Sequence, residues 1–259
     1  MLVNYHTHTE RCGHARGSER AYIETAIARG LETIGFSDHA PMPFPDGHVS
    51  GYRMTPEELP GYVETLLALR EEYRDRIEIL IGLEAEYYPH VFEAFLALLA
   101  PYPIDYLILG QHFLRDETGA PYPGHPTSDE SVLREYTDQV IAGMRTGAFS
   151  YVAHPDVMNF TGSDEIYLPY ARRLVRAAKE LGLPLEYNLL GQADGRQYPR
   201  KSFFAVAAAE GADVIVASDA HDPERVAEPG ELRKATALLS ELGVHPLTRI
   251  RLRPVPKHL

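Results

Sequence analysis

The amino-acid sequence predicts an α/β fold in which parallel strands form a closed or nearly closed barrel. Seven short apolar segments rich in β-branched and aromatic residues recur along the chain, and segments with helical periodicity separate them. Strands that alternate with helices form parallel sheets, and continuously apolar strands are typical of a sheet that helices cover. An open, doubly wound sheet is the alternative, but the sequence has no G-x-G-x-x-G motif after the first strand and no Walker-type loop.

The expected elements follow one another in a regular order. The seven strands are predicted at residues 2–6, 32–37, 78–84, 105–111, 149–154, 183–188 and 213–218. Long helices are predicted to start near Ser18, Thr55 and Asp164. Ser18 and Thr55 can cap a first helical turn, because a side-chain oxygen at that position accepts a hydrogen bond from a free backbone N–H. Glycines that can adopt a left-handed conformation are expected to end helices, namely Gly30, Gly182 and Gly211.

Length and composition are those of an ordinary globular protein. The chain has 259 residues, which fits one large domain spanning 1–259, and 44% of its residues are hydrophobic and 24% are charged. The formal net charge of −12 disfavours binding to a nucleic-acid backbone, because such binding requires clustered basic residues. Small molecules are therefore the expected partners, and the sequence predicts no particular oligomeric state.

Cysteine content and apolar runs bear on the cellular compartment. The single cysteine, Cys12, excludes an internal disulfide and a zinc site built from cysteines. No basic segment followed by an apolar core opens the chain, and no apolar run is long enough for a membrane span. We therefore expect a soluble, cytoplasmic protein with no membrane partner. The basic segment from Arg249 onward contains two prolines and is expected to be a surface tail.

Side chains that can bind metals follow six of the seven predicted strands. These side chains are His6, His8, Asp38, His39, Glu84, Glu86, His112, His154, Asp219 and His221. His14 lies in the loop after the first strand, and the remaining strand ends in Glu186 and Asn188. Active sites of parallel barrels form at the C-terminal ends of the strands, so we expect these side chains to meet in one mouth. The other histidines are expected to have no such role, namely His48, His90, His125, His245 and His258.

A ligand set of histidines and carboxylates favours a transition metal. Imidazole and carboxylate groups suit zinc, iron or manganese better than Ca²⁺ or Mg²⁺, which prefer oxygen ligands. A single catalytic zinc takes three protein ligands, so the larger set in this chain predicts two or three ions, with some carboxylate bridging. Since neutral imidazoles leave most of the positive charge of the ions uncompensated, the site is expected to attract an anionic group such as a phosphate.

Seven ordered motifs resemble those of a known family. They read HTHTE from residue 6, GHA from 13, SDHAPMP from 37, GLEAEY from 82, QHF from 111, AHPD from 153 and SDAH from 218. From about residue 4 to residue 226 the chain is similar to the PHP (polymerase and histidinol phosphatase) family, specifically to its histidinol-phosphate phosphatase branch. The resemblance implies a distorted TIM-like (β/α)7 barrel of the PHP type with three divalent metal ions, for which zinc, iron and manganese are the candidates.

The resemblance also implies a ligand set for each ion. One ion would be bound by His6, His8, Glu84 and Asp219, a second by Glu84, His112 and His154, and a third by His14, His39 and His221. The implied reaction is hydrolysis of L-histidinol phosphate to L-histidinol and phosphate, in histidine biosynthesis, by a hydroxide held between metals. Two alternatives remain open. One is a PHP phosphoesterase that acts on another substrate, such as a nucleotide or sugar phosphate, and the other is a noncatalytic metal-binding module.

The motifs constrain the catalytic and substrate-binding residues less. The candidate catalytic residues are Asp38, Glu84 and Asp156, although Asp38 could instead orient an imidazole or a water molecule and Asp156 could bind a substrate amine. The branch usually has basic residues after its AHxD-type motif, whereas residues 157–162 are nonbasic here. The candidate phosphate-binding residues are Arg53, Arg196, Arg200 and Lys201.

Overall fold

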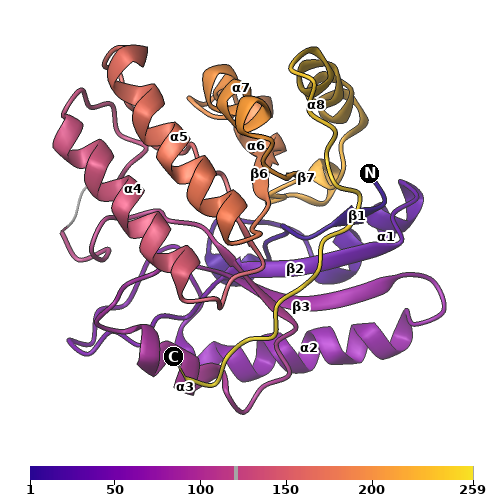
Figure 1. Cartoon of the computed structure of the whole chain (residues 1–259). Coiled ribbons are helices and arrows are strands. Elements are labelled where there is room, and N and C mark those ends of the chain that lie inside the picture. Colours follow the sequence, from indigo (N-terminus) through magenta and orange to yellow (C-terminus); the bar gives the residue numbers. More distant parts are fainter. Residues whose placement is uncertain (120–121, 259) are drawn as a thin grey trace.

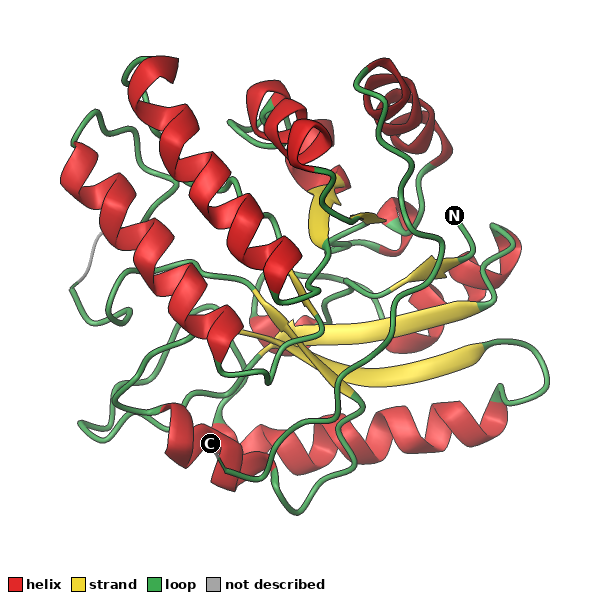
Figure 2. Cartoon of the chain, in the orientation of Figure 1, coloured by secondary structure: helices red, strands yellow, loops and turns green. Residues whose placement is uncertain are grey.

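A seven-stranded parallel sheet is the centre of the computed structural model, which describes residues 1–119 and 122–258 (Figures 1 and 2). The strands are β1 (Val3–Asn4), β2 (Thr33–His39), β3 (Glu78–Ala85), β4 (Tyr106–Leu109), β5 (Tyr151–Val152), β6 (Leu185–Asn188) and β7 (Val214–Ala217). Each strand pairs in parallel with the next one along the chain. A further parallel bridge joins Thr7 to Ala220, so the ends of the sheet approach each other. The predicted, nearly closed barrel with its seven strands is confirmed.

Helices surround the sheet (Figure 2). The described α-helices are α1 (Glu19–Ala28), α2 (Leu59–Glu72), α3 (Phe92–Leu99), α4 (Glu130–Arg145), α5 (Asp164–Glu180), α6 (Leu189–Ala193), α7 (Lys201–Glu210) and α8 (Pro229–Glu241), and the 3-10 helices are η1 (Glu10–Cys12), η2 (Pro56–Glu58) and η3 (Pro223–Arg225). As predicted, the Ser18 hydroxyl oxygen accepts from a backbone N–H of α1, and Gly211 ends α7 with a φ of 64°. At Thr55 the helix starts with the 3-10 turn η2, which precedes α2.

Within the described residues, no helix combines the length and the apolarity that crossing a membrane requires.

The face of the sheet that meets the helices holds the larger apolar core. Alternate residues of the strands are buried in it, such as Ile81 and Leu83 of β3 and Leu107 of β4. From the helical side, α4 contributes Val140 and Met144. Burial of one such side chain contributes about 1.5–3 kcal/mol, so this layer fixes the helices around the barrel.

A smaller apolar cluster fills the interior of the barrel. Its buried members are Val3, Tyr5, Tyr106, Ile108, Tyr151, Ala153 and Ile215. The hydroxyl group of Tyr106 donates to the backbone oxygen of Tyr5 at 2.6 Å. A Cβ on Gly35 would lie 2.2 Å from this hydroxyl oxygen, and a Cβ on Gly82 would lie 2.4 Å from the Tyr106 ring. Glycine at these two strand positions therefore makes room for the ring.

The C-terminal segment closes the barrel at the N-terminal ends of the strands. Leu247 forms a parallel bridge with β7, and Ile250 and Leu252 pack against the interior cluster. Figure 1 shows this segment, in yellow, running across the sheet toward the C-terminus. The prediction of a surface tail is therefore wrong here, because alternate residues of the basic segment are apolar and face the interior. The opposite end of the barrel stays open.

Replacing Gly82 with alanine would place a methyl group against the Tyr106 ring. We expect the free energy of unfolding, measured by chemical denaturation, to fall by about 1–3 kcal/mol, the usual cost of overpacking a core. Gly61→Ala in α2 is the matched control, because a Cβ there meets no neighbouring group within 4 Å. Alanine at that helical position should stabilise the protein by up to about 1 kcal/mol. Equal stability of the two variants would contradict the packing described for Tyr106.

Candidate metal centre

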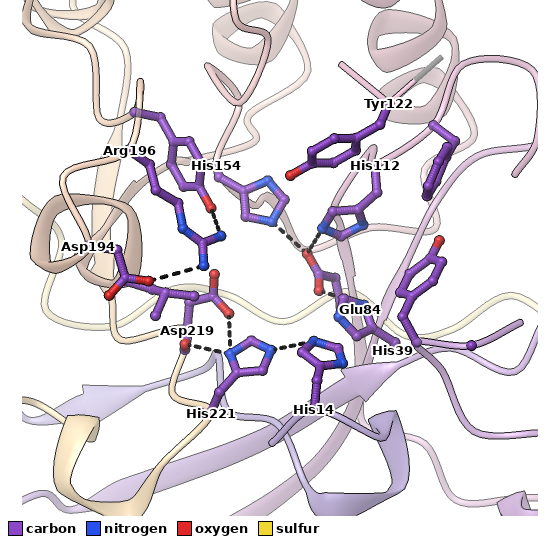
Figure 3. A pocket seen from close by; sticks show the side chains of 15 residues that line it. His14, His39, Glu84, His112, Tyr122, His154, Asp194, Arg196, Asp219 and His221 are labelled. Atoms are coloured by element: carbon purple, nitrogen blue, oxygen red, sulfur yellow. Dashed lines mark hydrogen bonds and ion pairs between the residues drawn. The ribbon is translucent and has the colours of Figure 1, made fainter. Parts of the chain in front are cut away.

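The predicted metal ligands converge at the C-terminal ends of the strands, and Figure 3 shows all of them except His6 and His8. Groups of described side chains whose potential ligand atoms lie within 4.8 Å of one another are His6, His8 and Asp219; His6, Glu84 and His154; His8, His39 and Glu84; His14, His39 and His221; and His8, Cys12 and His221. His112 adjoins these groups, because its Nε2 lies 3.5 Å from Oε1 of Glu84. The nine side chains predicted as ligands thus form one cluster, which we call the candidate centre.

Glu84, at the C-terminal end of β3, occupies the middle of the candidate centre. Its Oε2 lies 3.5 Å from the Nε2 atoms of both His6 and His8, and 3.1 Å from Nδ1 of His39. Its Oε1 lies 2.8 Å from Nε2 of His154. The two oxygens of one buried carboxylate therefore face different sets of imidazoles, which is the arrangement that a ligand bridging two ions needs.

The backbone is shaped around the candidate centre at three positions. Gly110 follows β4, and a Cβ there would lie 1.9 Å from Oε1 of Glu84, so glycine leaves the space that this carboxylate occupies. His154 and Asp219 have positive φ angles of 28° and 49°. Residues other than glycine adopt such angles at a cost of about 1–3 kcal/mol each, and they do so most often where a functional site requires the geometry. Both side chains point into the candidate centre.

Two imidazoles of the candidate centre face each other in a way that requires a cation. Nδ1 of His14 lies 2.9 Å from the backbone oxygen of Cys12, and Nδ1 of His221 lies 3.1 Å from that of Asp219. Because a carbonyl oxygen only accepts hydrogen bonds, each Nδ1 carries a proton, and in the neutral ring Nε2 is the unprotonated nitrogen. Each Nε2 then carries a lone pair, yet the two Nε2 atoms are 3.0 Å apart. Only a proton or a metal ion between these atoms makes the contact favourable.

Carboxylates behind the candidate centre orient two further imidazoles. Nδ1 of His6 lies 2.8 Å from Oε2 of Glu186, and Nδ1 of His112 lies 2.9 Å from Oε1 of Glu86. A hydrogen bond of this kind fixes the tautomer and directs the Nε2 lone pair toward a metal. No role was expected for Glu186 from the sequence, although a charged residue inside a predicted buried strand signals that a polar partner is needed.

Several buried ligand atoms have no hydrogen-bond partner among the described residues. They are Nε2 of His6, Nε2 of His8, Nδ1 of His39, Oε2 of Glu84 and Oδ1 of Asp219. A buried polar atom without a partner costs about 1–3 kcal/mol, so gathering these atoms is unfavourable unless cations bind. The short separations among them are 3.1 to 3.5 Å. Two ligands that are each about 2.0–2.1 Å from a tetrahedral ion are about 3.3 Å apart, so the residues fit metal ions.

Asp38 lies behind His8 and does not line the cavity above the candidate centre. Its Oδ2 accepts from the backbone N–H of Thr9 at 3.2 Å and from the Thr9 hydroxyl group. Its Oδ1 accepts from the backbone N–H of His39 at 2.8 Å and lies 3.4 Å from Nδ1 of His8. Of the two roles that the sequence left open for Asp38, this geometry favours orienting an imidazole.

Asp156, the other candidate catalytic residue outside the centre, lies in the loop after β5 and is buried against the start of α7. Its Oδ2 accepts from the backbone N–H of Arg200 at 2.5 Å, and its Oδ1 has no hydrogen-bond partner in the described part of the chain. Burial raises the pKa of Asp156 to about 7. The side chain is not among those that line the cavity, so the structure does not bring it to a substrate.

Arg200 and Lys201, predicted to bind phosphate, are engaged away from the candidate centre. The Arg200 guanidinium lies over the Tyr167 ring, 3.9 Å from its centroid, and donates to Oδ1 of Asp164 at 2.6 Å. Lys201 is exposed and pairs with Glu241 at 2.7 Å. These two side chains therefore do not reach the cavity, because they pair with Asp164 and Glu241 instead.

Arg53, also predicted to bind phosphate, is buried inside the protein. Its guanidinium pairs with Glu86 at 3.0 Å and with Glu117 at 2.9 Å. Burial opposes ionisation of Glu86, but Arg53 and His112 lower the pKa of this carboxyl group to about 2. Arg53 therefore has two carboxylate partners and does not line the cavity.

A cavity of about 550 Å³ opens above the candidate centre (Figure 3). Its aromatic lining residues are Tyr52, Phe113, Tyr122 and Tyr198. Arg196 donates to Oδ2 of Asp194 at 3.1 Å and to the Tyr198 hydroxyl oxygen at 3.0 Å. Among the described lining residues, Arg196 is the one arginine or lysine. The cavity thus combines the candidate centre, an aromatic wall and one guanidinium group. The sequence offered no signal for Asp194.

Comparisons with known proteins place the chain among phosphatases. Residues 4–189 match the PHP domain family. The chain is 30% identical over 233 residues to a protein named probable histidinol-phosphatase from Deinococcus radiodurans, and the match covers 87% of this chain and 88% of the relative. It is 35% identical over 120 residues to the histidinol-phosphatase of Bacillus subtilis, over 44% of each chain.

A solved structure has the same fold. It is the crystal structure of histidinol phosphate phosphatase from Lactococcus lactis, complexed with zinc, L-histidinol and phosphate. The two structures superpose with a TM-score of 0.75 at 22% sequence identity, over 96% of this chain and 98% of that chain. This likeness confirms the predicted (β/α)7 barrel of the PHP type.

Replacing Glu84 with glutamine removes the charge that faces both sets of imidazoles and preserves the size of the side chain. We expect the affinity for Zn²⁺, measured by competition with a chelator, to fall by more than about 100-fold, beyond the 10–100-fold loss typical of residues that only orient a ligand. His245→Gln is the control, because His245 is exposed and lies outside the candidate centre. Unchanged Zn²⁺ affinity in Glu84→Gln would contradict the central position of this carboxylate.

Proposed function

The chain belongs to the PHP family, and we propose that it is a metal-dependent phosphatase that hydrolyses L-histidinol phosphate to L-histidinol and phosphate. The observation that carries the proposal is the candidate centre itself, in which imidazole lone pairs converge beneath an open cavity. A histidine-rich cation site attracts anions more strongly than a carboxylate-rich one, which favours a phosphate ester as substrate.

The proposed cofactors are three divalent transition-metal ions, namely zinc, iron or manganese. The proposed ligands are His6, His8, Glu84 and Asp219 for one ion, Glu84, His112 and His154 for a second, and His14, His39 and His221 for a third. Such ions, once bound, would neutralise charge on the phosphoryl oxygens and lower the pKa of a water molecule. The absence of cysteine from this proposed set agrees with an imidazole-preferring metal.

Arg196 is the residue that we propose to contact the phosphate group beside the candidate centre. A guanidinium has five N–H donors, and the contacts to Asp194 and Tyr198 leave others free for phosphate oxygens. Asp194 and Tyr198 hold the guanidinium at the edge of the cavity, so little conformational freedom is lost when it binds an anion. Charge-assisted hydrogen bonds of this type are stronger than neutral ones.

The remaining lining residues suit the organic part of the substrate. L-histidinol carries an imidazole ring and an ammonium group. Tyr52, Phe113 and Tyr122 form an aromatic wall, with ring centroids 5.7 Å apart for each neighbouring pair, against which a flat ring can pack. We propose that the carboxylate of Asp194, which lies beside Arg196 in the cavity lining, binds the ammonium group of the substrate.

A second substrate class deserves a test, because the cavity is open and its aromatic wall does not select one ring. A nucleotide or sugar phosphate could present the same phosphate group to the candidate centre and its base or hydroxyl groups to the wall. A noncatalytic metal-binding role is disfavoured, because all nine proposed ligands are present and the cavity gives access to them.

We also propose that the chain is a single domain. Residues from both ends of the sequence contribute to the same barrel, since β1 and the segment around Ile250 pack into one interior cluster.

Hydrolysis of a phosphomonoester panel tests the proposed reaction. Metal-free protein reconstituted with Zn²⁺, Mn²⁺ or Fe²⁺ is expected to release phosphate fastest from L-histidinol phosphate, and chelation should abolish the release because the protein alone cannot neutralise the phosphoryl charge. Faster hydrolysis of a nucleoside monophosphate or a sugar phosphate would reject L-histidinol phosphate as the substrate. No hydrolysis of any ester with any of these metals would reject the phosphatase activity.

Asp194→Asn tests the proposed recognition of the ammonium group. We expect kcat/KM for L-histidinol phosphate to fall about 10-fold or more, since a hydrogen bond to a charged group contributes about 1.5–3 kcal/mol. Hydrolysis of phenyl phosphate, which has no amine, should change less. Asp164→Asn is the control, because Asp164 pairs with Arg200 outside the cavity. An equal loss with both esters would indicate that Asp194 acts only by holding Arg196.

A further inference from the structure

A buried arginine joins two loops behind the candidate centre. Arg53, from the loop after β2, donates from Nη1 and Nη2 to the two oxygens of Glu86, at 3.0 Å each. It also donates from Nε and Nη2 to Oε2 of Glu117, at 3.1 and 2.9 Å, and Glu117 lies in the loop after β4. The three side chains are 1 to 3% exposed, so water does not screen these contacts. We call Arg53, Glu86 and Glu117 the Arg53 unit.

The Arg53 unit contacts the candidate centre through one atom of Glu86. Oε1 of Glu86 lies 2.9 Å from Nδ1 of His112, and the Tyr52 hydroxyl group donates to the same oxygen at 3.0 Å. Both oxygens of Glu86 accept hydrogen bonds from Arg53, as expected of a carboxylate, so Nδ1 of His112 is the donor in its contact with Oε1. The Nε2 lone pair of His112 then points toward Oε1 of Glu84, at 3.5 Å.

The charges of the Arg53 unit favour a cation at His112. Two carboxylates surround one guanidinium, which leaves a net negative charge in a buried place. A buried charge is unfavourable unless an opposite charge lies nearby. The nearest groups that can offset it are His112, on the side of the candidate centre, and His48, whose Nε2 lies 2.8 Å from Oε1 of Glu117 on the partly exposed side.

We propose that the Arg53 unit is a positioning device that fixes His112 as a metal ligand through Nε2. The proposal rests on the proposed metal dependence and extends it to residues that touch neither metal nor substrate. Glu86 orients the imidazole directly, and Glu117 acts through Arg53. Without Glu117, the Arg53 guanidinium would pair with Glu86 alone. Its positive charge would then make the Glu86 carboxylate a weaker acceptor for the Nδ1 proton of His112. The loop after β4, which carries Glu117, is thereby coupled to metal binding.

Zinc binding to the full chain tests the proposal without relying on turnover. Stoichiometry and affinity for Zn²⁺ are measured by chelator competition for wild type, Glu86→Gln and Glu117→Gln. We expect Glu86→Gln to weaken one site about 10–100-fold and Glu117→Gln to weaken the same site about 10-fold, the range known for residues that orient a metal-bound histidine. Glu135→Gln is the matched control, because Glu135 pairs with Arg115 of the same loop and does not contact the Arg53 unit.

A double-mutant cycle separates positioning from a general effect on the fold. If Glu117 acts through His112, adding Glu117→Gln to His112→Ala should not weaken Zn²⁺ binding further. Metal-free Glu117→Gln should unfold in one cooperative transition at a lower melting temperature than Glu135→Gln, because it loses a buried ion pair, so Zn²⁺ affinities are compared at a temperature at which both variants are folded. Wild-type Zn²⁺ affinity in Glu117→Gln, or an undiminished loss in the His112→Ala background, would overturn the proposal. Phosphate release by wild type is measured separately, so failure of the proposed reaction is distinguishable from failure of the positioning unit.

Discussion

Electron-rich atoms are crowded together around Glu84, in the interior of the protein and at the mouth of the barrel. The carboxylate oxygens lie 2.8 to 3.5 Å from imidazole nitrogens, and Nε2 of His14 and Nε2 of His221 approach within 3.0 Å of each other. His154 can donate a hydrogen bond to Glu84, whereas neutral rings of His6 and His112, whose Nδ1 atoms face Glu186 and Glu86, direct Nε2 lone pairs toward the carboxylate and are repelled by it. The rest of the barrel keeps this unfavourable arrangement in place, and divalent cations are what would make it favourable.

The barrel supplies the rigidity that this crowding requires. Parallel strands deliver side chains from distant parts of the sequence to one end, and the interior cluster around Tyr106 forms a floor beneath them. The C-terminal segment seals the other end. Partners behind the imidazoles, such as Glu186 for His6, then set which nitrogen faces the centre. The cost of positive φ at His154 and Asp219 is offset by the packing of the surrounding barrel.

Much of this organisation follows from the sequence because the barrel obeys simple geometric rules. Strand alternation and the common direction of parallel strands are enough to predict that His6, Glu84 and Asp219 converge, although they are far apart along the chain. The family resemblance added His14, whose loop position obeys no strand rule. Partners of long, flexible side chains are set by tertiary contacts that no local pattern records. For this reason the sequence could not predict that Arg53 is buried between carboxylates or that Lys201 pairs on the surface.

The C-terminal segment is a second part of the structure that the sequence did not predict, for a different reason. Its basic and proline residues dominate its composition, and composition predicted a surface tail. The spacing of Ile250 and Leu252, two residues apart, is what places both against the interior cluster. Two apolar residues are too short a pattern to predict burial in a segment with this much charge. The packing of Ile250 and Leu252 against the interior cluster is therefore evident only in the folded barrel.

Anomalous X-ray diffraction from crystals equilibrated with Zn²⁺ tests most directly whether the convergent imidazoles exist to bind cations. We expect anomalous peaks on both sides of the Glu84 carboxylate and a further peak between His14 and His221. Well-ordered crystals with no peak among these side chains, or with zinc bound only on the outer surface, would contradict a cation-binding role of the candidate centre.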